Sequence, residues 1–281
     1  SSSAASDVYK RQVHMGFIID ETPYAGGKES ERVFCVRANN PSPMTYTGTN
    51  TWVLAEAASP ECIVIDPAPA GEHVQKVLNA CIDQGLRVGA VVCTHMHADH
   101  TEGAEELADI SGARVYAPFD GTLLPGEFCS IENGPALRVV PLPGHSSDSV
   151  GLVYPADRSM FTGDVVFKHG PTVVYYPDGN LGDYMASLDV LERIVKEEGI
   201  RVFYPGHGYP ITDPLQAIEA TRQHRLERLQ QIKDALSEAR RAWARQHAQE
   251  RSLRERAGAA RDGAGPLGRG VARQASREIP S

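Results

Sequence analysis

Hydrophobic and polar positions along the chain predict a mixture of short strands and longer helices. Runs rich in β-branched residues are separated by stretches in which apolar residues recur every three or four positions, as at Val74, Val77, Leu78 and Cys81. Each element is bounded by Gly, Pro, Asn or Asp. The predicted strands are residues 32–37, 51–55, 62–65, 88–93, 114–117, 137–140, 150–154, 159–161 and 202–204, and the predicted helices are residues 73–84, 103–110, 181–198 and 214–236.

The order of these elements predicts the fold class. Predicted strands are about twice as numerous as predicted helices, and the helices are distributed between the strands. This arrangement favours an α/β (α+β) fold in which two sheets stack face to face and carry helices on their outer sides.

The composition is that of a soluble globular protein. The chain of 281 residues is 41% hydrophobic and 23% charged, with a net charge of -8. No apolar run approaches the roughly 20 residues that span a bilayer, and no secretory leader is recognisable. We therefore expect a cytoplasmic protein without a membrane partner. The acidic charge offers no global attraction to nucleic acid, and five scattered cysteines predict neither disulfides nor a thiolate zinc site.

The two ends of the chain differ in pattern from its middle. Residues 1–14 have no apolar period and are interpreted as a non-native leader or scar, so the folded domain is expected over residues 15–236. From residue 237 onward there are ten Arg and five acids, a net charge of +5 (10 minus 5), against -13 (18 minus 31) elsewhere. This Arg-, Ala- and Gly-rich composition predicts a disordered tail over residues 237–281. The alternative is a basic arm that binds nucleic acid or another partner.

Histidine and aspartate residues gather where predicted strands end. The run VVCTHMHADHTEG places three histidines and an aspartate between positions 95 and 100, directly after a strand. Four further strands end in or near a similar residue: Asp66, His145, Asp164 and His207. Because rigid strands followed by Gly or Pro turns fix side chains in place, this pattern predicts a metal site.

The residue types also fit a metal site. Zinc and similar divalent ions favour imidazole nitrogen and carboxylate oxygen. Residues two apart on an extended segment point the same way, so His95 and His97 can hold one ion, while Asp99 and His100 can address a second. The remaining histidines are interpreted as ordinary surface or packing residues: His14, His73, His169, His224 and His247.

In this order the motifs resemble those of the metallo-β-lactamase superfamily, over about Val33 to Leu236. Within it the chain looks most like the lactamase-beta-like protein 2 group, through the runs NPSP (40–43), TGTNT (47–51), LPGHS (142–146), DYMASL (183–188) and YPGHG (204–208). The resemblance implies a four-layer αβ/βα sandwich with a binuclear, usually zinc, site at the sheet edges, iron and manganese being alternatives. Animal members of that group continue into a winged-helix-like module where this chain has its basic tail.

The resemblance also implies roles for individual residues. One ion would bind His95, His97 and His145, the other Asp99, His100 and His207, with Asp164 as a bridge. Asp66 would orient the ligand loop through hydrogen bonds. A hydroxide bridging the two ions would be the nucleophile, with Asp99 and Asp164 as the catalytic carboxylates, so hydrolysis is the predicted reaction. The loop after Asp164 supplies three candidate substrate contacts: Lys168, Tyr175 and Tyr176.

Several substrates are compatible with such a site. We favour a thioester or ester, carried by a small molecule or an acyl carrier. Single-stranded RNA is the alternative that the resemblance to lactamase-beta-like protein 2 suggests. β-Lactams are disfavoured because the lactamases themselves do not use an aspartate bridge such as Asp164. A lesser alternative is a mononuclear iron oxidoreductase of the persulfide dioxygenase type, which would leave Asp99, His100 and His207 without a metal.

Overall fold

The computed structural model describes residues 24–262. The predicted leader of residues 1–14 and the final part of the predicted tail, residues 263–281, lie outside the described residues. The chain divides after His224 into two units. In residues 24–262 no helix combines the length and the apolar character needed to cross a membrane.

The first unit begins with a six-stranded mixed sheet. Its strands lie in sequence order, with antiparallel pairing from the first to the fourth and parallel pairing from the fourth to the sixth. They are β1 (Gly27–Lys28), β2 (Val33–Arg37), β3 (Asn50–Ala55), β4 (Glu61–Ile65), β5 (Arg87–Val92) and β6 (Arg114–Tyr116), and the associated helices are α2 (Glu72–Asp83), α3 (Ala98–Thr101) and α4 (Ala104–Ser111).

The second sheet has five strands in the order β11-β10-β9-β8-β7. Only β10 and β11 pair in parallel within it. Its strands are β7 (Phe128–Ser130), β8 (Ala136–Pro141), β9 (Val150–Tyr154), β10 (Ser159–Gly163) and β11 (Val202–Pro205); two 3-10 turns, η1 (Pro118–Asp120) and η2 (Pro155–Asp157), and helix α5 (Leu181–Glu198) complete this half. Asn180 begins α5, since its side chain accepts hydrogen bonds from the Gly182 and Asp183 amides.

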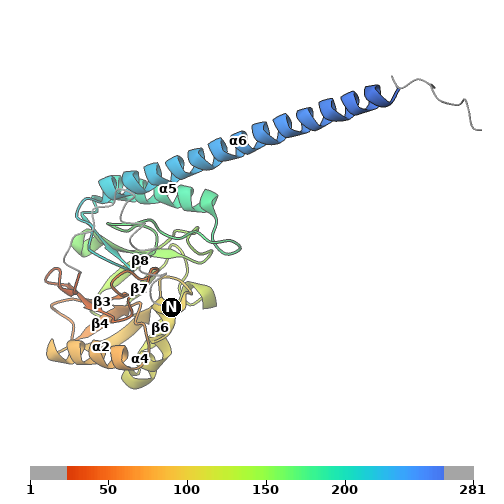
Figure 1. Cartoon of the computed structure of the whole chain (residues 1–281). Coiled ribbons are helices and arrows are strands. Elements are labelled where there is room, and N and C mark those ends of the chain that lie inside the picture. Colours follow the sequence, from red (N-terminus) through yellow and green to blue (C-terminus); the bar gives the residue numbers. More distant parts are fainter. Residues whose placement is uncertain (1–23, 263–281) are drawn as a thin grey trace, which may run out of the picture. The chain divides into compact units, whose positions relative to one another are not determined.

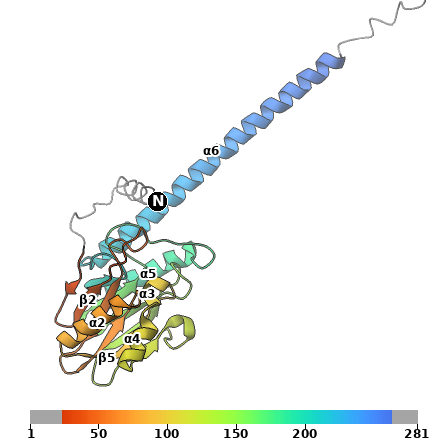
Figure 2. The ribbon, with the colours of Figure 1, turned by 60° about the horizontal axis from the view of Figure 1, so that its bottom comes forward.

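Three apolar clusters fill the spaces between these elements, which stack as four layers (Figures 1 and 2). Side chains alternate along a strand, so Leu54 and Ile63 lie in the cluster between the sheets, whereas Val53 and Val64 lie in the cluster beneath α2 and α4. The third cluster joins the outer face of the second sheet to Leu188 and its neighbours on α5. The order of helix, sheet, sheet and helix confirms the predicted αβ/βα sandwich.

Most predicted elements agree with the structure to within two residues. Among residues 24–262, three short strands or α-helices were not predicted: β1, β7 and α3, of two, three and four residues. Elements of this length contain too few positions for an apolar period to show. Their pairing or helical turn is set by neighbouring elements instead.

The last helix differs most from its prediction. Helix α6 (Pro214–Asp262) continues for 49 residues, so its predicted end at Leu236 is wrong, as is the predicted disorder over residues 237–262. The segment is rich in Ala, Arg, Glu, Gln and Leu, which are strong helix formers. Hydrogen bonds four residues apart, such as Gln230 Nε2 to Asp234 Oδ1 at 2.9 Å, support it. It lacks a strong apolar period because its described side chains beyond Arg225 are almost all exposed.

Candidate metal centre

The seven predicted ligands come together at one edge of the two sheets. His95 and His97 follow β5, Asp99 and His100 belong to α3, and the others follow strands of the second sheet, His145 after β8, Asp164 after β10 and His207 after β11. Five of them are buried, while His97 and Asp99 are partly exposed. The strand ends of both sheets therefore converge on one cluster.

Three histidines form the first group of the cluster. His97 Nδ1 lies 3.0 Å from His95 Nε2 and 3.0 Å from His145 Nε2. These three nitrogens all lie within 4.8 Å of one another. Three imidazole nitrogens that face one point form a group that can hold a divalent cation.

The second group contains carboxylates. His207 Nε2 lies 3.3 Å from Asp99 Oδ2 and 3.3 Å from Asp164 Oδ2, and His100 Nε2 lies 3.3 Å from Asp164 Oδ1. Asp164 Oδ2 is also 3.7 Å from His145 Nε2 in the first group. Asp164 therefore lies between the two groups, in the position that the resemblance implies for a bridging ligand.

Hydrogen bonds at one ring nitrogen of His145 and of His100 determine which of their nitrogens faces the cluster. His145 Nδ1 donates to the Val173 carbonyl at 2.6 Å, and His100 Nδ1 donates to Asp66 Oδ2 at 2.9 Å, since neither acceptor carries a proton to give. With Nδ1 of each ring engaged in this way, the Nε2 atom is the one that points into the cluster. Metal-binding histidines need this orientation.

Several atoms at the centre test whether the cluster fits a metal ion. His100 Nε2, His207 Nε2 and Asp164 Oδ1 are buried and have no hydrogen-bond partner among the described residues. Leaving buried polar atoms unpaired costs free energy, and a bound cation removes this cost. The donor set of imidazoles and carboxylates, with its buried unpaired atoms, therefore fits divalent metal binding.

The two groups also differ in charge. Burial lowers the pKa of His95 and His97, which are consequently neutral. Burial also acts to lower the pKa of His100 and His207, but Asp164 outweighs it, raising the pKa of His100 well above its usual range and that of His207 to about 9. Burial acts to raise the pKa of Asp164, yet His207 and His100 hold it well below its usual range. The second group therefore combines imidazoles with carboxylates, whereas the first group consists of three imidazoles.

Close backbone packing requires glycine in the turns that carry the ligands. A Cβ atom at Gly206 would lie 2.4 Å from Asp164 Oδ1 and 2.6 Å from His100 Cε1. The same turn is joined to the first sheet, because the Asn50 amide donates to the Gly206 carbonyl at 2.8 Å. The Pro-Gly-His motif therefore lets the backbone approach the cluster, while the first sheet fixes the position of His207.

Asp66 lies behind the cluster and is hydrogen-bonded to the loop that carries His95 to His100. Its Oδ1 atom accepts the Thr94 amide at 2.8 Å, and its Oδ2 atom accepts the Thr94 hydroxyl at 2.8 Å and His100 Nδ1 at 2.9 Å. The carboxylate of Asp66 thereby joins the end of β4 to the start of the ligand loop at Thr94 and to His100 in α3.

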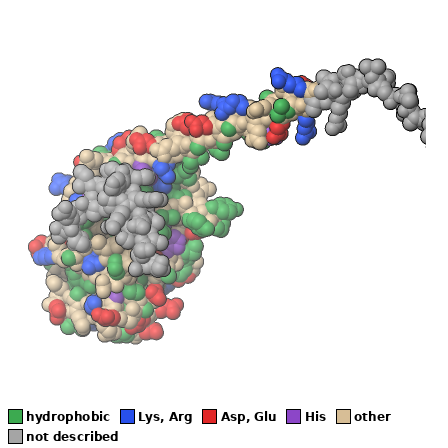
Figure 3. Space-filling model, viewed as in Figure 1, with side chains coloured by type: hydrophobic (Ala, Val, Ile, Leu, Met, Phe, Trp, Pro, Cys, Tyr) green, Lys and Arg blue, Asp and Glu red, His purple; other side chains and the backbone are tan. Residues whose placement is uncertain are grey.

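The predicted substrate contacts lie in a loop attached to the cluster. The carbonyl of Val173 accepts the hydrogen bond from His145, which attaches this loop to a candidate ligand. Tyr175 and Tyr176 follow Val173 by two and three residues and are 75% and 84% exposed. Lys168 is exposed, with Nζ 5.1 Å from the ring centroid of Tyr209. Figure 3 shows hydrophobic side chains gathered next to histidine side chains on one face of the molecule.

Sequence reasoning missed two aromatic residues beside the cluster. The ring centroid of Phe167 lies 5.7 Å from that of His207, and Tyr46 lies 6.4 Å from His207 and 5.4 Å from Phe167. Tyr46 adopts a positive φ of 54°, which is uncommon for a residue other than glycine. The run around positions 40–51 indicated this region, but nothing in it distinguished Tyr46.

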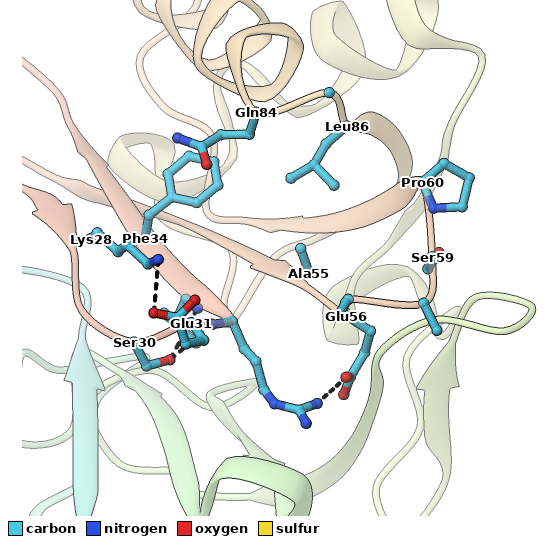
Figure 4. Close-up of a pocket in the computed structure, with 15 residues that line it drawn as sticks. Lys28, Ser30, Glu31, Phe34, Ala55, Glu56, Ser59, Pro60, Gln84 and Leu86 are labelled. Carbon is cyan, nitrogen blue, oxygen red and sulfur yellow. Dashed lines mark hydrogen bonds and ion pairs between the residues drawn. The ribbon is translucent and has the colours of Figure 1, made fainter.

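A separate cavity of about 470 Å³ lies among the opposite strand ends of the first sheet (Figure 4). It is lined by the start of β2, the end of β3 and the turn before β5. Its charged side chains pair with each other, Lys28 with Glu31 and Arg32 with Glu56. We assign it no part in the chemistry of the cluster.

Comparison with known proteins agrees with this fold and donor set. The sequence profile of the metallo-beta-lactamase superfamily matches residues 44–118 and 112–207, which include all seven candidate ligands and Asp66. The chain belongs to the metallo-beta-lactamase superfamily. A metallo-beta-lactamase family protein from Thermus thermophilus has the same fold, with a TM-score of 0.60 and 22% identity over 73% of this chain and 83% of that one.

Two relatives in the superfamily carry different names. The atrochrysone carboxyl ACP thioesterase of Aspergillus fumigatus is 33% identical over 71% of this chain and 64% of its own length. The beta-lactamase-like protein 2 homolog of Caenorhabditis elegans is 26% identical over 75% of this chain and 73% of its own length. The chain thus spans less than two thirds of the Aspergillus relative.

Proposed function

We propose that this protein is a metal-dependent hydrolase that acts on a thioester or ester and uses two divalent ions, with zinc as the expected metal. The observation that carries this proposal is the pair of ligand groups that meet at Asp164. His95, His97 and His145 would hold one ion, Asp99, His100 and His207 the other, and Asp164 both. When bound, such ions supply a solvent nucleophile at neutral pH and polarise the oxygen of the electrophile.

The chain's own residues prepare this centre for hydrolysis. The hydrogen bond from His145 Nδ1 to Val173 keeps the Nε2 atom of that ring directed into the cluster, and Asp66 does the same for His100. Asp164 and Asp99 supply negative charge that compensates two divalent cations. The packed sandwich behind them keeps the ligands in place without a change of conformation.

The charge of the surrounding loops favours a carbon-centred substrate over RNA. Within the described ligand loops, at residues 40–49, 94–103, 143–149, 164–180 and 205–213, Lys168 is the single lysine or arginine. Besides the predicted ligands, the same loops carry four acidic residues: Glu102, Asp148, Asp178 and Asp213. Arg37, at the end of β2, lies next to the first loop, and its guanidinium donates a hydrogen bond to the Thr47 carbonyl. Phosphate backbones are bound chiefly through lysine and arginine, so these loops are poorly suited to RNA.

Exposed apolar side chains in the same loops suit an acyl group. Met96, Val173, Tyr175 and Tyr176 are all more than 40% exposed. Such residues bind apolar substrates by removing hydrocarbon surface from water. We therefore propose Tyr175 and Tyr176 as contacts for the acyl group and Lys168 as a contact for a polar or anionic part of the substrate.

The relatives support the same choice. Superfamily membership and a relative named as an acyl-carrier thioesterase favour hydrolysis of a thioester, carried by a small molecule or by an acyl carrier protein. The Caenorhabditis elegans relative is the reason to include single-stranded RNA as a competing substrate in the test below.

A parallel assay tests the proposal. The zinc-loaded protein is incubated with an acyl thioester, a lactone, single-stranded RNA and a chromogenic β-lactam, beside an Asp164→Ala variant and the exposed control Asp83→Ala. We expect the wild-type protein and Asp83→Ala to hydrolyse the thioester and Asp164→Ala to lose this activity. RNA cleavage without thioester hydrolysis would overturn the choice of substrate, and full activity of Asp164→Ala would overturn the assignment of the centre.

A further inference from the structure

Asp66 has a backbone conformation that its side chain alone does not explain. Its φ is 55°, in the left-handed region that residues other than glycine rarely adopt. The residue is 1% exposed, and its carboxylate holds both Thr94 and His100. Because the direction of the carboxylate follows from this backbone conformation, whatever holds the conformation also positions His100.

Two buried side chains hold the backbone of Asp66. The Thr51 hydroxyl, from β3, donates to the Asp66 carbonyl at 2.9 Å, and His73 Nε2, from the first turn of α2, lies 2.7 Å from the same hydroxyl. Thr51 is fully buried and His73 is 4% exposed. The hydrogen bonds therefore run from α2 through β3 to the end of β4, and from there to the ligand loop.

The directions of these hydrogen bonds follow from proton counting. A hydroxyl has one proton, and Thr51 gives it to the carbonyl, which can only accept. His73 Nε2 must then be the donor to the Thr51 oxygen, which fixes the ring as the neutral Nε2–H tautomer. A neutral ring is consistent with the pKa of His73, which burial and the charge of Lys76 lower to about 4. His73 is thus more than the ordinary packing residue that its sequence context indicates.

We infer that His73 and Thr51 are positioning residues that fix Asp66, and through it His100, in the geometry needed to bind metal. The inference rests on the proposed metal centre. Neither residue contacts a candidate ligand in a described hydrogen bond or ion pair, so each acts only through Asp66. The ion at Asp99, His100 and His207 should depend most on them, because Asp66 bonds to His100 directly but reaches His95 only through the Thr94 hydroxyl.

Metal affinity, rather than activity, provides the test. Dissociation constants for two equivalents of Zn²⁺ are measured by chelator competition in four variants of the full chain: Thr51→Val, Thr51→Ser, His73→Met and His73→Gln. Thr51→Val and His73→Met lose a hydrogen-bonding group, so we expect one of the two sites to weaken about tenfold. Thr51→Ser and His73→Gln keep a hydroxyl or an N–H donor and should restore most of the affinity.

A packing variant separates positioning from general loosening of α2. Val77 is fully buried on the same helix and takes no part in the hydrogen bonds, so Val77→Ala should lower the melting temperature without changing either dissociation constant. Wild-type affinity in both Thr51→Val and His73→Met would overturn the inference, as would an equal weakening in Val77→Ala. Because zinc binding is the readout, the inference can fail while thioester hydrolysis stands, and it can hold even if the substrate proves to be RNA.

Discussion

The sandwich of residues 24–224 and the helical segment of residues 225–262 keep their conformations for different reasons. In the sandwich, three buried clusters fix two sheets and their covering helices, and every candidate ligand lies at the edge of these packed layers. In the helical segment most of the described large apolar side chains are exposed, with Trp243 63% and Leu236 61% accessible. Its conformation depends on helix propensity and on contacts between residues one turn apart.

This difference explains where chemistry can be located. A metal centre needs ligands held within a fraction of an ångström, and only side chains locked by packing and by supporting hydrogen bonds provide that. The helical segment has charged and apolar side chains but no buried elements to fix them. We therefore expect substitutions in the sandwich to change activity and stability strongly, and equivalent substitutions in the helical segment to change them little.

Loss of a ligand should give the largest contrast between the two regions. His97→Ala removes the nitrogen that His95 and His145 face, and we expect thioester hydrolysis to fall by at least about a thousandfold, equivalent to about 4 kcal/mol of transition-state stabilisation. Trp243→Ala in the helical segment should stay within about twofold of the wild type. Steady-state kinetics at saturating Zn²⁺ measure both, and a large loss in Trp243→Ala would show that the helical segment takes part in the reaction.

Matched leucine substitutions compare the stability of the two regions. Leu54 is fully buried between the sheets, so Leu54→Ala should lower the free energy of unfolding by about 2–5 kcal/mol. Leu236→Ala removes the same atoms from an exposed position and should change it by less than about 0.5 kcal/mol. Urea denaturation monitored by tryptophan fluorescence measures both changes. Similar losses would contradict the assignment of Leu236 to an unpacked helix face.

Acid should weaken the sandwich through His73. Its pKa is about 4 in the folded protein, against 6.5 for a free side chain, so the unfolded chain binds a proton that the folded chain refuses between these values. The stabilising contribution of the neutral ring is complete above pH 6.5 and falls as the pH drops toward 4, by about 2 kcal/mol after allowance for partial solvation. Chemical denaturation at pH 7 and pH 4.5 measures the loss, and His73→Gln should remove this component. An unchanged pH dependence in that variant would assign the acid sensitivity to other groups.

Glycine substitution in the helical segment should have the smallest effect. Ala244→Gly lies at an exposed helical position and should weaken the local helix by about 1 kcal/mol. Hydrogen exchange of the amides around residues 240–250 should accelerate about fivefold, while the melting temperature of the sandwich stays unchanged. A lower melting temperature would show that the segment is stabilised together with the sandwich.

The sequence predicted the sandwich well because most of its strands and helices bury one side and so carry a hydrophobic period. It failed for residues 237–262 because an exposed helix has no buried side and no such period; composition then resembled that of a disordered tail. Here the helix propensity of Ala, Arg and Glu was the better guide.

The candidate centre was predictable to a different depth at each residue. The seven candidate ligands come shortly after strands, four of them in the run 95–100 and the other three in Gly- or Pro-containing turns, so both their types and their positions were visible in the sequence. Tyr46, Phe167, Thr51 and His73 were not, because they reach the cluster or Asp66 through tertiary packing between segments far apart in the chain. His73 looked ordinary because its partner is 22 residues away on β3.

Metal-dependent thioester hydrolysis is tested most directly by titrating the chelator-treated protein with Zn²⁺ while the turnover of an acyl thioester and the bound metal are measured together. We predict that turnover rises with bound zinc and reaches its maximum at two ions per chain, and that Asp164→Ala stays inactive at every zinc concentration. Maximal turnover in the metal-free protein, or an active form that contains one iron per chain and consumes oxygen with a persulfide, would contradict the proposed function.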